Sequence, residues 1–232
     1  MAESRYTGFS WAREWFADHR VLVVGGSSGI GAAIARGFLA AGARVFVTGV
    51  SAEEAEKTAS DPLLSGATAL ALDVRDADAV EAEIGALGDL DCLVNCAGII
   101  RRGEELDPAV FAQVVDINLT GTMRCCAAAR PALANSPSGA ILNTASMLSF
   151  FGGGLVPGYA ASKGGISQLT RSLAIAYASD AIRVNAVAPG WIETPLTQGL
   201  RDDPERSRTI LDRTPMGRWG QPEDIASAAL FL

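Results

Sequence analysis

The chain has 232 residues, of which 49% are hydrophobic and 19% are charged, and this composition suits one large α/β domain with an ample core. Its formal net charge is −7 and it has no basic cluster, which argues against a nucleic-acid partner and favours a small soluble substrate. No apolar stretch reaches the roughly 18 to 20 residues of a membrane span, and the N-terminus lacks the apolar core of a signal peptide. We therefore expect a cytoplasmic protein without a membrane partner.

The cysteines and histidines predict no metal site. The sequence contains four cysteines, Cys92, Cys96, Cys125 and Cys126, which form no C-x-x-C pair, and a single histidine. A zinc site would need more ligands at closer spacing. We expect buried free thiols and no disulfide framework.

Residues 1–20 predict an N-terminal extension. They contain Trp11, Trp15 and Phe16 among charged residues, which indicates a short amphipathic helix packed on the domain or on a neighbouring subunit. From Val21 onward, apolar runs of strand length alternate with helical patterns, as in βαβ units. The expected strands are 21–25, 44–48, 67–72, 91–95, 140–145 and 182–188, and the expected helices lie near 29–41, 52–60, 76–87, 108–133 and 158–179.

This alternation predicts one Rossmann-like domain over residues 21–232, a doubly wound parallel sheet with helices on both faces. Ser51, followed three residues later by Glu54, predicts a capping box that opens the second helix. Pro222 opens a final helix that runs to Leu232. Because an open sheet often continues after such a helix, we expect a last strand to be missing from this chain.

The run V-V-G-G-S-S-G-I-G at 23–31 follows the first strand and opens the first helix. Gly25, Gly29 and Gly31 allow a tight turn, close approach of the backbone to a pyrophosphate, and close packing of helix on strand. Such glycines also occur in ordinary strand-to-helix turns, but their position in the first βα unit favours a dinucleotide site. The turn also brings Ser27, Ser28 and Ile30 to that site.

The cofactor is expected to be NAD or NADP. An Asp or Glu at the end of the second strand commonly binds the ribose 2′-hydroxyl of NAD, whereas an Arg there accepts the 2′-phosphate of NADP. The segment T-G-V-S at 48–51 offers neither, and because no cation is present NAD is favoured. Asp73, after the third strand, is either an adenine contact or a solvated loop acid.

Tyr159 and Lys163, in the run Y-A-A-S-K, form a proton-transfer pair. Residues at i and i+4 share one helix face, so the phenol and the ammonium can converge on one point. A lysine charge close by would lower the pKa of the phenol from roughly 10 toward neutrality, which would make it an acid or base at physiological pH. Ser146 precedes Tyr159 in N-T-A-S-M-L-S.

Several motifs occur together in a fixed order: V-G-G-S-S-G-I-G, L-D-V at 72–74, N-C-A-G at 95–98, D-I-N-L-T-G around Asn118, Ser146, Y-x-x-x-K, and P-G-W-I-E-T at 189–194. Over nearly all of residues 20–232 the chain resembles the short-chain dehydrogenase/reductase family. The resemblance implies a Rossmann-like fold and a catalytic tetrad of Asn118, Ser146, Tyr159 and Lys163. It also implies cofactor contacts from Val74, Asn95, Ala97, Gly98, Pro189, Gly190, Ile192 and Thr194.

Within that resemblance, Tyr159 moves the hydroxyl proton and Ser146 hydrogen-bonds the same oxygen. Lys163 lowers the pKa of Tyr159 and binds the nicotinamide ribose, and Asn118 anchors a water that links Lys163 to solvent. The structural alternatives are a surface Tyr and Lys, a capping Ser and a helix Asn. The resemblance further implies a homodimer or homotetramer that pairs through the long helices near 108–133 and 158–179.

Three further runs, G-I-I-R-R at 98–102, N-T-A-S-M-L-S-F-F-G-G at 143–153 and I-L-D-R-T-P-M-G-R-W-G-Q-P-E-D at 210–224, resemble the sugar-acid branch of the family, the 2-dehydro-3-deoxy-gluconate and gluconate 5-dehydrogenases. Arg101 or Arg102 could hold a substrate carboxylate, or both could be solvated or lie at a subunit contact. The resemblance also implies a substrate pocket lined by Ser146, Met147, Leu148, Gly153 and Trp191, although core packing is the alternative for Leu148 and Trp191.

Two departures from the family pattern stand out. Val24 replaces the usual Thr before the first glycine, and the chain ends at Leu232, where family members usually continue into a last strand. The main prediction is a sugar-acid dehydrogenase. Its rivals are a reductase of another ketone, such as a 3-oxoacyl thioester or a steroid, and a non-catalytic NAD(P)-binding regulatory protein.

Overall fold

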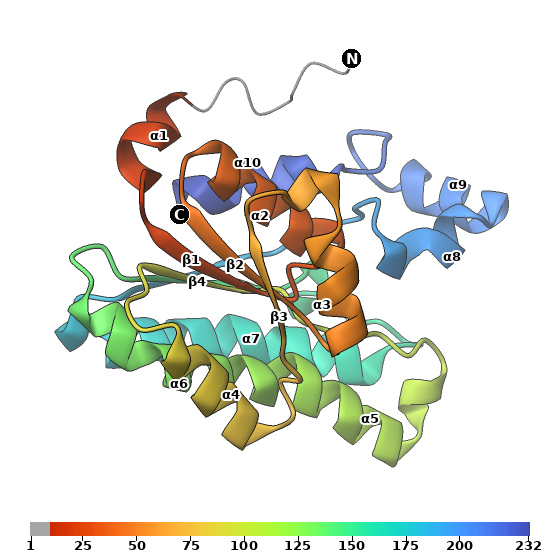
Figure 1. Cartoon of the computed structure of the whole chain (residues 1–232). Coiled ribbons are helices and arrows are strands. Elements are labelled where there is room, and N and C mark those ends of the chain that lie inside the picture. The colour runs from red at the N-terminus through yellow and green to blue at the C-terminus, as the bar shows by residue number, and fades with distance from the viewer. Residues whose placement is uncertain (1–9) are drawn as a thin grey trace.

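A six-stranded parallel sheet organises the computed structural model, which describes residues 10–232 (Figure 1). The strands lie in the order β3-β2-β1-β4-β5-β6, as predicted for a doubly wound fold. Their bounds are β1 (Arg20–Val24), β2 (Arg44–Gly49), β3 (Thr68–Ala71), β4 (Cys92–Asn95), β5 (Ala140–Thr144) and β6 (Arg183–Val187).

The centre of the sheet contains its topological switch point. Strand β1 pairs with β2 on one side, where Val21 faces Val45, and with β4 on the other, where Val21 faces Cys92. The chain therefore winds outward in one direction from β1 and then restarts in the other. In open parallel sheets a ligand crevice forms at the carboxyl ends of the strands at such a point.

Helices cover both faces of the sheet, and Figure 1 shows α1, α2 and α10 on one face and α4 to α7 on the other. No helix among residues 10–232 combines the length and apolar character needed to cross a bilayer. The bounds are α1 (Ser10–Phe16), α2 (Gly29–Ala40), α3 (Ala52–Ala59), α4 (Ala77–Ala86), α5 (Pro108–Val115), α6 (Gly121–Asn135), α7 (Pro157–Ala176), α8 (Gln198–Arg201), α9 (Pro204–Asp212) and α10 (Pro222–Phe231).

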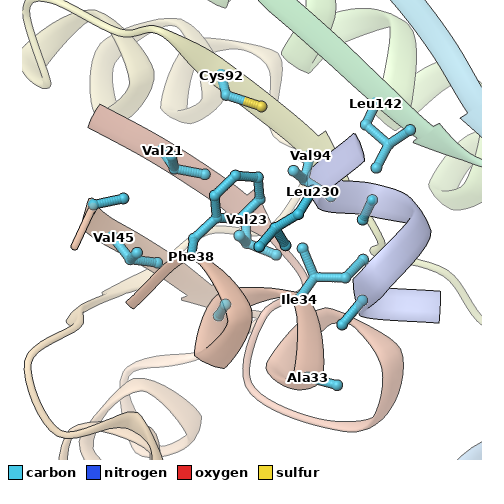
Figure 2. Packing of buried hydrophobic residues seen from close by; sticks show 14 of the residues in the cluster. Val21, Val23, Ala33, Ile34, Phe38, Val45, Cys92, Val94, Leu142 and Leu230 are labelled. Atoms are coloured by element: carbon cyan, nitrogen blue, oxygen red, sulfur yellow. The ribbon is translucent and has the colours of Figure 1, made fainter. Parts of the chain in front are cut away.

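The first face of the sheet buries a core built around helix α2. Figure 2 shows Phe38 and Ile34 of α2 against Val23 of β1 and Leu230 of α10. Phe38 is 1% exposed, and burial of such a side chain contributes about 1.5 to 3 kcal/mol.

The predicted N-terminal helix forms at Ser10–Phe16 and packs on the domain. Phe16 of α1 contacts Phe38 edge to face, with ring centroids 5.0 Å apart. Residues 1–9 lie outside the described part of the chain.

The second face buries a separate core between the sheet and helices α4, α6 and α7. Leu93 of β4 and Leu133 of α6 are fully buried there, together with Cys125 and Cys126. All four cysteines are free thiols, as predicted. Burial raises the pKa of Cys92, Cys125 and Cys126 to about 12.

The helix predicted over 108–133 is interrupted. Helix α5 ends at Val115, a π-helical turn spans Asp116–Thr120, and α6 begins at Gly121. Gly121 packs closely on the loop that follows β3. A Cβ on Gly121 would lie 2.6 Å from Val74 Cγ2. Periodicity alone does not reveal one wide turn inside an otherwise regular helical pattern, and such turns are frequent at functional sites.

The capping box predicted at α3 forms only in part. Ser51 Oγ accepts a hydrogen bond from the Glu54 backbone N–H at 3.3 Å, as expected of an N-cap. The Glu54 carboxylate, however, accepts from the N–H of Val50 at 2.8 Å and not from that of Ser51. The segment 195–213 contains helices α8 and α9.

We predict that Leu93→Ala lowers the free energy of unfolding by about 2 to 5 kcal/mol, because it leaves a cavity in a core where Leu93 has no exposed surface. Leu63→Ala is the matched control, since Leu63 is 66% exposed, and it should change stability by less than about 0.5 kcal/mol. Urea unfolding followed by circular dichroism measures both. Equal effects of the two substitutions would contradict the placement of this core.

Candidate active site

A cleft of about 540 Å³ opens at the carboxyl ends of the central strands. Its walls carry the glycine turn after β1 at one end and Tyr159 and Lys163 of α7 at the other. Residues predicted for a dinucleotide and for proton transfer, which lie more than a hundred positions apart in the sequence, therefore share one cavity.

The glycine turn depends on the absence of side chains. Gly25 has φ +75°, and a Cβ on it would lie 2.5 Å from the Ala97 backbone nitrogen. A Cβ on Gly31 would overlap the Gly25 carbonyl oxygen. The backbone of β1, the loop after β4 and the start of α2 can therefore meet only if these positions remain glycine.

Thr48 ties the glycine turn to strand β2. The Gly25 N–H donates to Thr48 Oγ1 and the Gly26 N–H to the Thr48 carbonyl, both at 3.1 Å. Both the side chain and the backbone of this β2 residue therefore hold the turn. The turn remains tied to its surroundings despite the departure from the family pattern.

The turn fits the phosphates of a dinucleotide. Helix α2 begins at Gly29 with the N–H groups of its first turn directed toward the cleft end, and its N-cap residue Ser28 makes no side-chain cap hydrogen bond. A helix N-terminus with unpaired N–H groups and a positive dipole end favours an anion. Because Gly25, Gly29 and Gly31 carry no side chains, the residues of this turn fit the cofactor that the sequence predicts.

Asp73 and Arg75 form an ion pair on the cleft wall that follows β3. Arg75 Nη2 lies 2.6 Å from Asp73 Oδ2, and the Arg75 N–H also donates to Asp73 Oδ1 at 3.0 Å. The hydrogen bonds from Arg75 lower the pKa of the Asp73 carboxyl group. Asp73 lines the cleft as predicted, while its contact with adenine stays a prediction.

Tyr159 and Lys163 lie one turn apart near the start of α7. Lys163 is 5% exposed, its Nζ donates to the Thr144 carbonyl at 2.5 Å, and it lies 5.6 Å from the centroid of the Tyr159 ring. Burial lowers the pKa of Lys163 to about 8. The ammonium is therefore held within the same pocket as the phenol, but it bonds to the end of β5.

The pKa of Tyr159 differs in direction from the sequence-based expectation. Burial raises the pKa of its phenol, a hydrogen bond with the Ser146 side chain opposes that shift, and the charge of Glu105 adds to it. Lys163 is itself desolvated and its ammonium is directed to Thr144, so the cost of burying the phenolate dominates in the free protein.

Ser146 follows β5 and acts as the N-cap of the short 3-10 turn Met147–Ser149. Its Oγ accepts from the Leu148 N–H at 3.1 Å, as the capping alternative predicted. Ser149 Oγ donates to the Lys163 carbonyl at 2.6 Å, which ties this turn to α7. The cap fixes the Ser146 hydroxyl beside Tyr159, so the structural role and the proximity to the phenol occur together.

Asn118 occupies the π-helical turn and is completely buried. Its Oδ1 accepts from the Ile99 N–H at 2.8 Å, and its Nδ2 donates to the Ile99 carbonyl at 3.0 Å and to Ser162 Oγ at 3.1 Å. A Cβ on Gly98 would lie 3.2 Å from Asn118 Oδ1 and 3.8 Å from Lys163 Nζ. Asn118 thus holds the loop after β4 against α7, and its role as a water anchor stays a prediction.

Sequence reasoning missed Glu105, a buried carboxylate that is 1% exposed. Its Oε1 accepts from the Arg101 N–H and its Oε2 from the Tyr159 N–H, both at 2.7 Å. One acid therefore fixes the loop that carries Arg101 and the helix turn that carries Tyr159. The sequence E-E-L at 104–106 resembles an ordinary acidic loop, so only the fold reveals the bridge.

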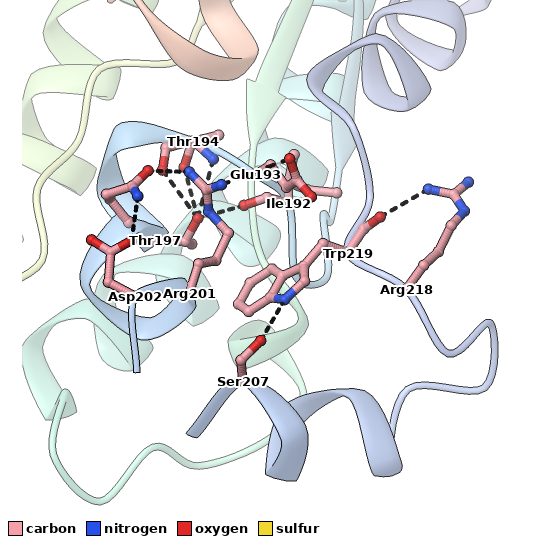
Figure 3. A network of polar contacts seen from close by, with 10 residues as sticks. Ile192, Glu193, Thr194, Thr197, Arg201, Asp202, Ser207, Arg218 and Trp219 are labelled. Carbon is pink, nitrogen blue, oxygen red and sulfur yellow. Dashed lines mark hydrogen bonds and ion pairs between the residues drawn. The ribbon is translucent and has the colours of Figure 1, made fainter. Parts of the chain in front are cut away.

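The loop after β6 closes the cleft near the glycine turn. Thr194 lines the cleft, and a Cβ on Gly29 would lie 3.3 Å from Thr194 Cγ2. Figure 3 shows the polar contacts that hold this segment, including Thr197 Oγ1 to the Ile192 carbonyl at 2.6 Å and Trp219 Nε1 to Ser207 Oγ at 3.0 Å.

The remaining predicted residues lie at or behind these walls. Arg101 lines the cleft, whereas Arg102 is exposed outside the lining. Leu148 lies against Gly153, and Trp191 packs edge to face on Trp219 at 5.8 Å, the packing alternative given for it. Residues behind the lining are Asn95, which donates to Asn143 Oδ1 at 2.9 Å inside the sheet, Pro189, whose carbonyl accepts from Met147, and Gly190.

Several residues that line the cleft were not singled out from the sequence. Most of them lie at or after the carboxyl ends of strands, where a ligand crevice is expected, whereas Gln113 belongs to α5 and Ile117 to the π-helical turn. They are Thr48, Gly49, Val50, Glu54, Leu72, Arg75, Cys96, Ile99, Gln113, Ile117, Thr144, Pro195 and Leu196.

Known proteins resemble this chain over nearly its whole length. The model of a family described as enoyl-(acyl carrier protein) reductase matches residues 24–232. Galactitol 2-dehydrogenase (L-tagatose-forming) of Cereibacter sphaeroides is 40% identical over 221 residues, which cover 90% of this chain and 85% of that relative. The chain belongs to the short-chain dehydrogenase/reductase family.

Two further relatives define the neighbourhood of this short-chain dehydrogenase. The 2-dehydro-3-deoxy-D-gluconate 5-dehydrogenase of Dickeya dadantii is 40% identical over 91% of this chain and 86% of its own. A crystal structure from Agrobacterium tumefaciens, described as a 2-deoxy-D-gluconate 3-dehydrogenase with bound NADP, has a TM-score of 0.83 and 41% identity over 93% of this chain and 89% of its own. The protein is an NAD(P)-dependent oxidoreductase that acts on CH–OH groups.

We predict a pH-dependent difference in stability between the short-chain dehydrogenase and its Lys163→Met variant. The pKa of Lys163 is about 8 in the folded protein and 10.5 ordinarily, so between these values the unfolded chain binds the extra proton. The wild type should therefore gain about 3 kcal/mol relative to the variant as pH rises from 8 to 10.5.

Urea unfolding of both proteins at pH 8 and pH 10.5 measures this difference. The buried cysteines, whose raised pKa values destabilise the fold above pH 9, are present in both proteins and cancel in the comparison. Parallel stability curves would contradict a desolvated Lys163.

Proposed function

We propose that this enzyme interconverts a secondary hydroxyl and a ketone on a sugar acid, such as 2-dehydro-3-deoxy-gluconate or gluconate, with NAD as the preferred cofactor. The observation that carries the proposal is the shared cleft, whose walls include the glycine turn, Tyr159, Lys163 and Arg101. A dinucleotide seated on the turn and a substrate near Tyr159 would meet within this cleft. The bound nicotinamide would supply or accept the hydride.

Tyr159 moves the proton in this proposal. In the oxidative direction its oxygen takes the proton of the substrate hydroxyl, and in the reductive direction it returns one to the ketone oxygen. Ser146, whose side chain already interacts with Tyr159, donates a hydrogen bond to the same substrate oxygen as charge changes there. The cap at Leu148 holds the Ser146 hydroxyl in that place.

Lys163 and Asn118 support Tyr159. With a pKa of about 8, Lys163 is mostly protonated at neutral pH, so it places a positive charge near a phenol whose charged form burial disfavours. Lys163 also has the reach to bond a ribose hydroxyl of the cofactor. Asn118 keeps the loop after β4 beside Lys163 and anchors the route by which the proton leaves.

Arg101 is the proposed partner of the substrate carboxylate. It lines the cleft on the loop that Glu105 fixes to the Tyr159 turn, so one buried carboxylate holds the backbones of Arg101 and Tyr159 relative to each other. A planar guanidinium suits bidentate binding of a carboxylate. The names of the relatives, a 2-dehydro-3-deoxy-D-gluconate 5-dehydrogenase and a galactitol 2-dehydrogenase, support a polyhydroxylated substrate.

We also expect a homodimer or homotetramer that works in the cytoplasm. Helices α5, α6 and α7 carry exposed apolar side chains at Phe111, Met123 and Ile175, the last 81% exposed. These side chains support pairing of that helical face with a second copy.

We predict that Tyr159→Phe lowers kcat at least about 100-fold, because the substituted ring cannot transfer a proton. Calorimetric binding of NADH should stay within about threefold of the wild type. Tyr177→Phe is the matched control, since Tyr177 is also buried, near the end of α7, and it should retain activity. Turnover that survives Tyr159→Phe would rule out the proton-transfer role.

A substrate panel tests the carbon skeleton. Gluconate and 2-dehydro-3-deoxy-gluconate should be turned over better than 3-oxoacyl thioesters or steroids, with nicotinamide absorbance as the signal. Arg101→Met should raise KM for the sugar acids roughly 10- to 100-fold and leave KM for an uncharged polyol such as galactitol nearly unchanged. Arg102→Met is the matched control. A preference for acyl thioesters would contradict the sugar-acid assignment. So would an Arg101→Met variant whose KM for sugar acids rises no more than its KM for galactitol, or no more than the KM of Arg102→Met for sugar acids.

A further inference from the structure

A carboxylate lies at the end of strand β2, and it belongs to a residue of the following helix. Dinucleotide-binding folds commonly place an Asp or Glu at this point for the adenosine ribose. Here the strand ends at Gly49, and the next two residues, Val50 and Ser51, are uncharged. The cleft wall nevertheless contains an acid at this end, Glu54 of helix α3.

Glu54 occupies the volume that a side chain at position 49 would need. A Cβ on Gly49 would lie 2.8 Å from Glu54 Cγ and 3.1 Å from Glu54 Cδ. The three atoms nearest to that Cβ position all belong to the Glu54 side chain. The Glu54 side chain thus fits the space that Gly49 leaves empty. The strand itself ends without a carboxylate, and the carboxylate at this place comes from the first turn of α3.

Two hydrogen bonds orient the carboxylate between the glycine turn and β2. Ser27 Oγ donates to Glu54 Oε1 at 2.5 Å, and the Val50 N–H donates to Glu54 Oε2 at 2.8 Å. Ser27, Val50 and Glu54 all line the cleft. Because an ionised carboxylate has about four acceptor positions, two donors leave capacity for ligand hydroxyls.

The charge at this end of the cleft is unfavourable for an added phosphate. Among the described residues lining the cleft, the cations are Arg75, Arg101 and Lys163. Arg75 is engaged by Asp73 through two of its nitrogens, while Lys163 belongs to the reactive end and Arg101 to the loop after β4. Glu54 and Asp73 therefore provide two carboxylates near the end of the cleft where β2 and β3 terminate.

We propose that Glu54 binds the 2′-hydroxyl of the adenosine ribose and repels a 2′-phosphate, which makes it the residue that selects NAD over NADP. The inference rests on the proposed function in one respect, that the cleft binds a nicotinamide dinucleotide. It separates this enzyme from its relative of 41% identity, whose crystal structure contains NADP. Cofactor choice in this enzyme would then depend on a side chain from α3.

Isothermal calorimetry with NAD and NADP, and with 5′-AMP and 2′,5′-ADP as fragments of their adenosine ends, tests the proposal without any substrate. The wild type should bind NAD roughly 100-fold more tightly than NADP. Glu54→Gln retains the shape of the side chain and removes its charge. It should strengthen NADP binding at least about 10-fold and weaken NAD binding about 3- to 10-fold, so that the selectivity largely disappears.

Glu56→Gln is the matched control, because it removes the same charge from an exposed position of the same helix and should leave the NADP/NAD ratio unchanged. Gly49→Ala provides a second route if Glu54→Gln fails to fold. Its methyl group displaces the Glu54 side chain and leaves the charge in the protein, and it should also reduce selectivity.

A wild type that binds NADP as tightly as NAD overturns the proposal, as does a selectivity ratio that Glu54→Gln changes no more than Glu56→Gln. Binding of neither dinucleotide overturns the cofactor site itself. If sugar acids are not turned over while the dinucleotide ratios behave as stated, only the proposed substrate fails and the assignment of Glu54 stands.

Discussion

The contact between backbones at the end of β1 is the constraint on which the rest of the site depends. Gly25 lies against the Ala97 nitrogen, and Gly31 lies against the Gly25 carbonyl, with no room for a Cβ at either position. This contact brings the start of α2 and the loop after β4 to one point beside the switch in strand order. The cleft between the phosphate cradle and α7 exists because these three segments can approach so closely.

Buried polar groups organise the reactive end of that cleft. Glu105, Asn118 and Lys163 have almost no exposed surface, and each bonds to a segment distant in sequence. A buried polar group without partners would cost several kcal/mol, so these bonds restrict the loop after β4, the end of β5 and the first turns of α7 to one arrangement. The same restriction sets Arg101 relative to Tyr159, which relates substrate binding to proton transfer.

The two ends of the cleft differ in electrostatic character. Near α7, burial lowers the pKa of Lys163 toward neutral pH and raises that of Tyr159 away from it, so in the free protein burial disfavours the charged form of both groups. Near β2 and β3, Glu54 and the Asp73–Arg75 pair create a wall with more acid than base. Glu54 reaches this wall only because residue 49 has no side chain. In our proposal the ribose is therefore bound by a helix residue, whereas a residue at the end of the strand commonly binds it.

The sequence by itself determined the alternation of strands and helices, the glycine turn, and the spacing of Ser146, Tyr159 and Lys163, because these depend on local periodicity and on motifs of few residues. It could not reveal the π-helical turn at Asn118, the hydrogen bond from the Gly25 N–H to Thr48, or the bridge made by Glu105. Nor could it show that Glu54 would leave its expected capping bond for Val50 and Ser27. Each of these was decided by the tertiary structure, since side-chain partners are chosen by distance in space once the strands are paired and the helices are packed.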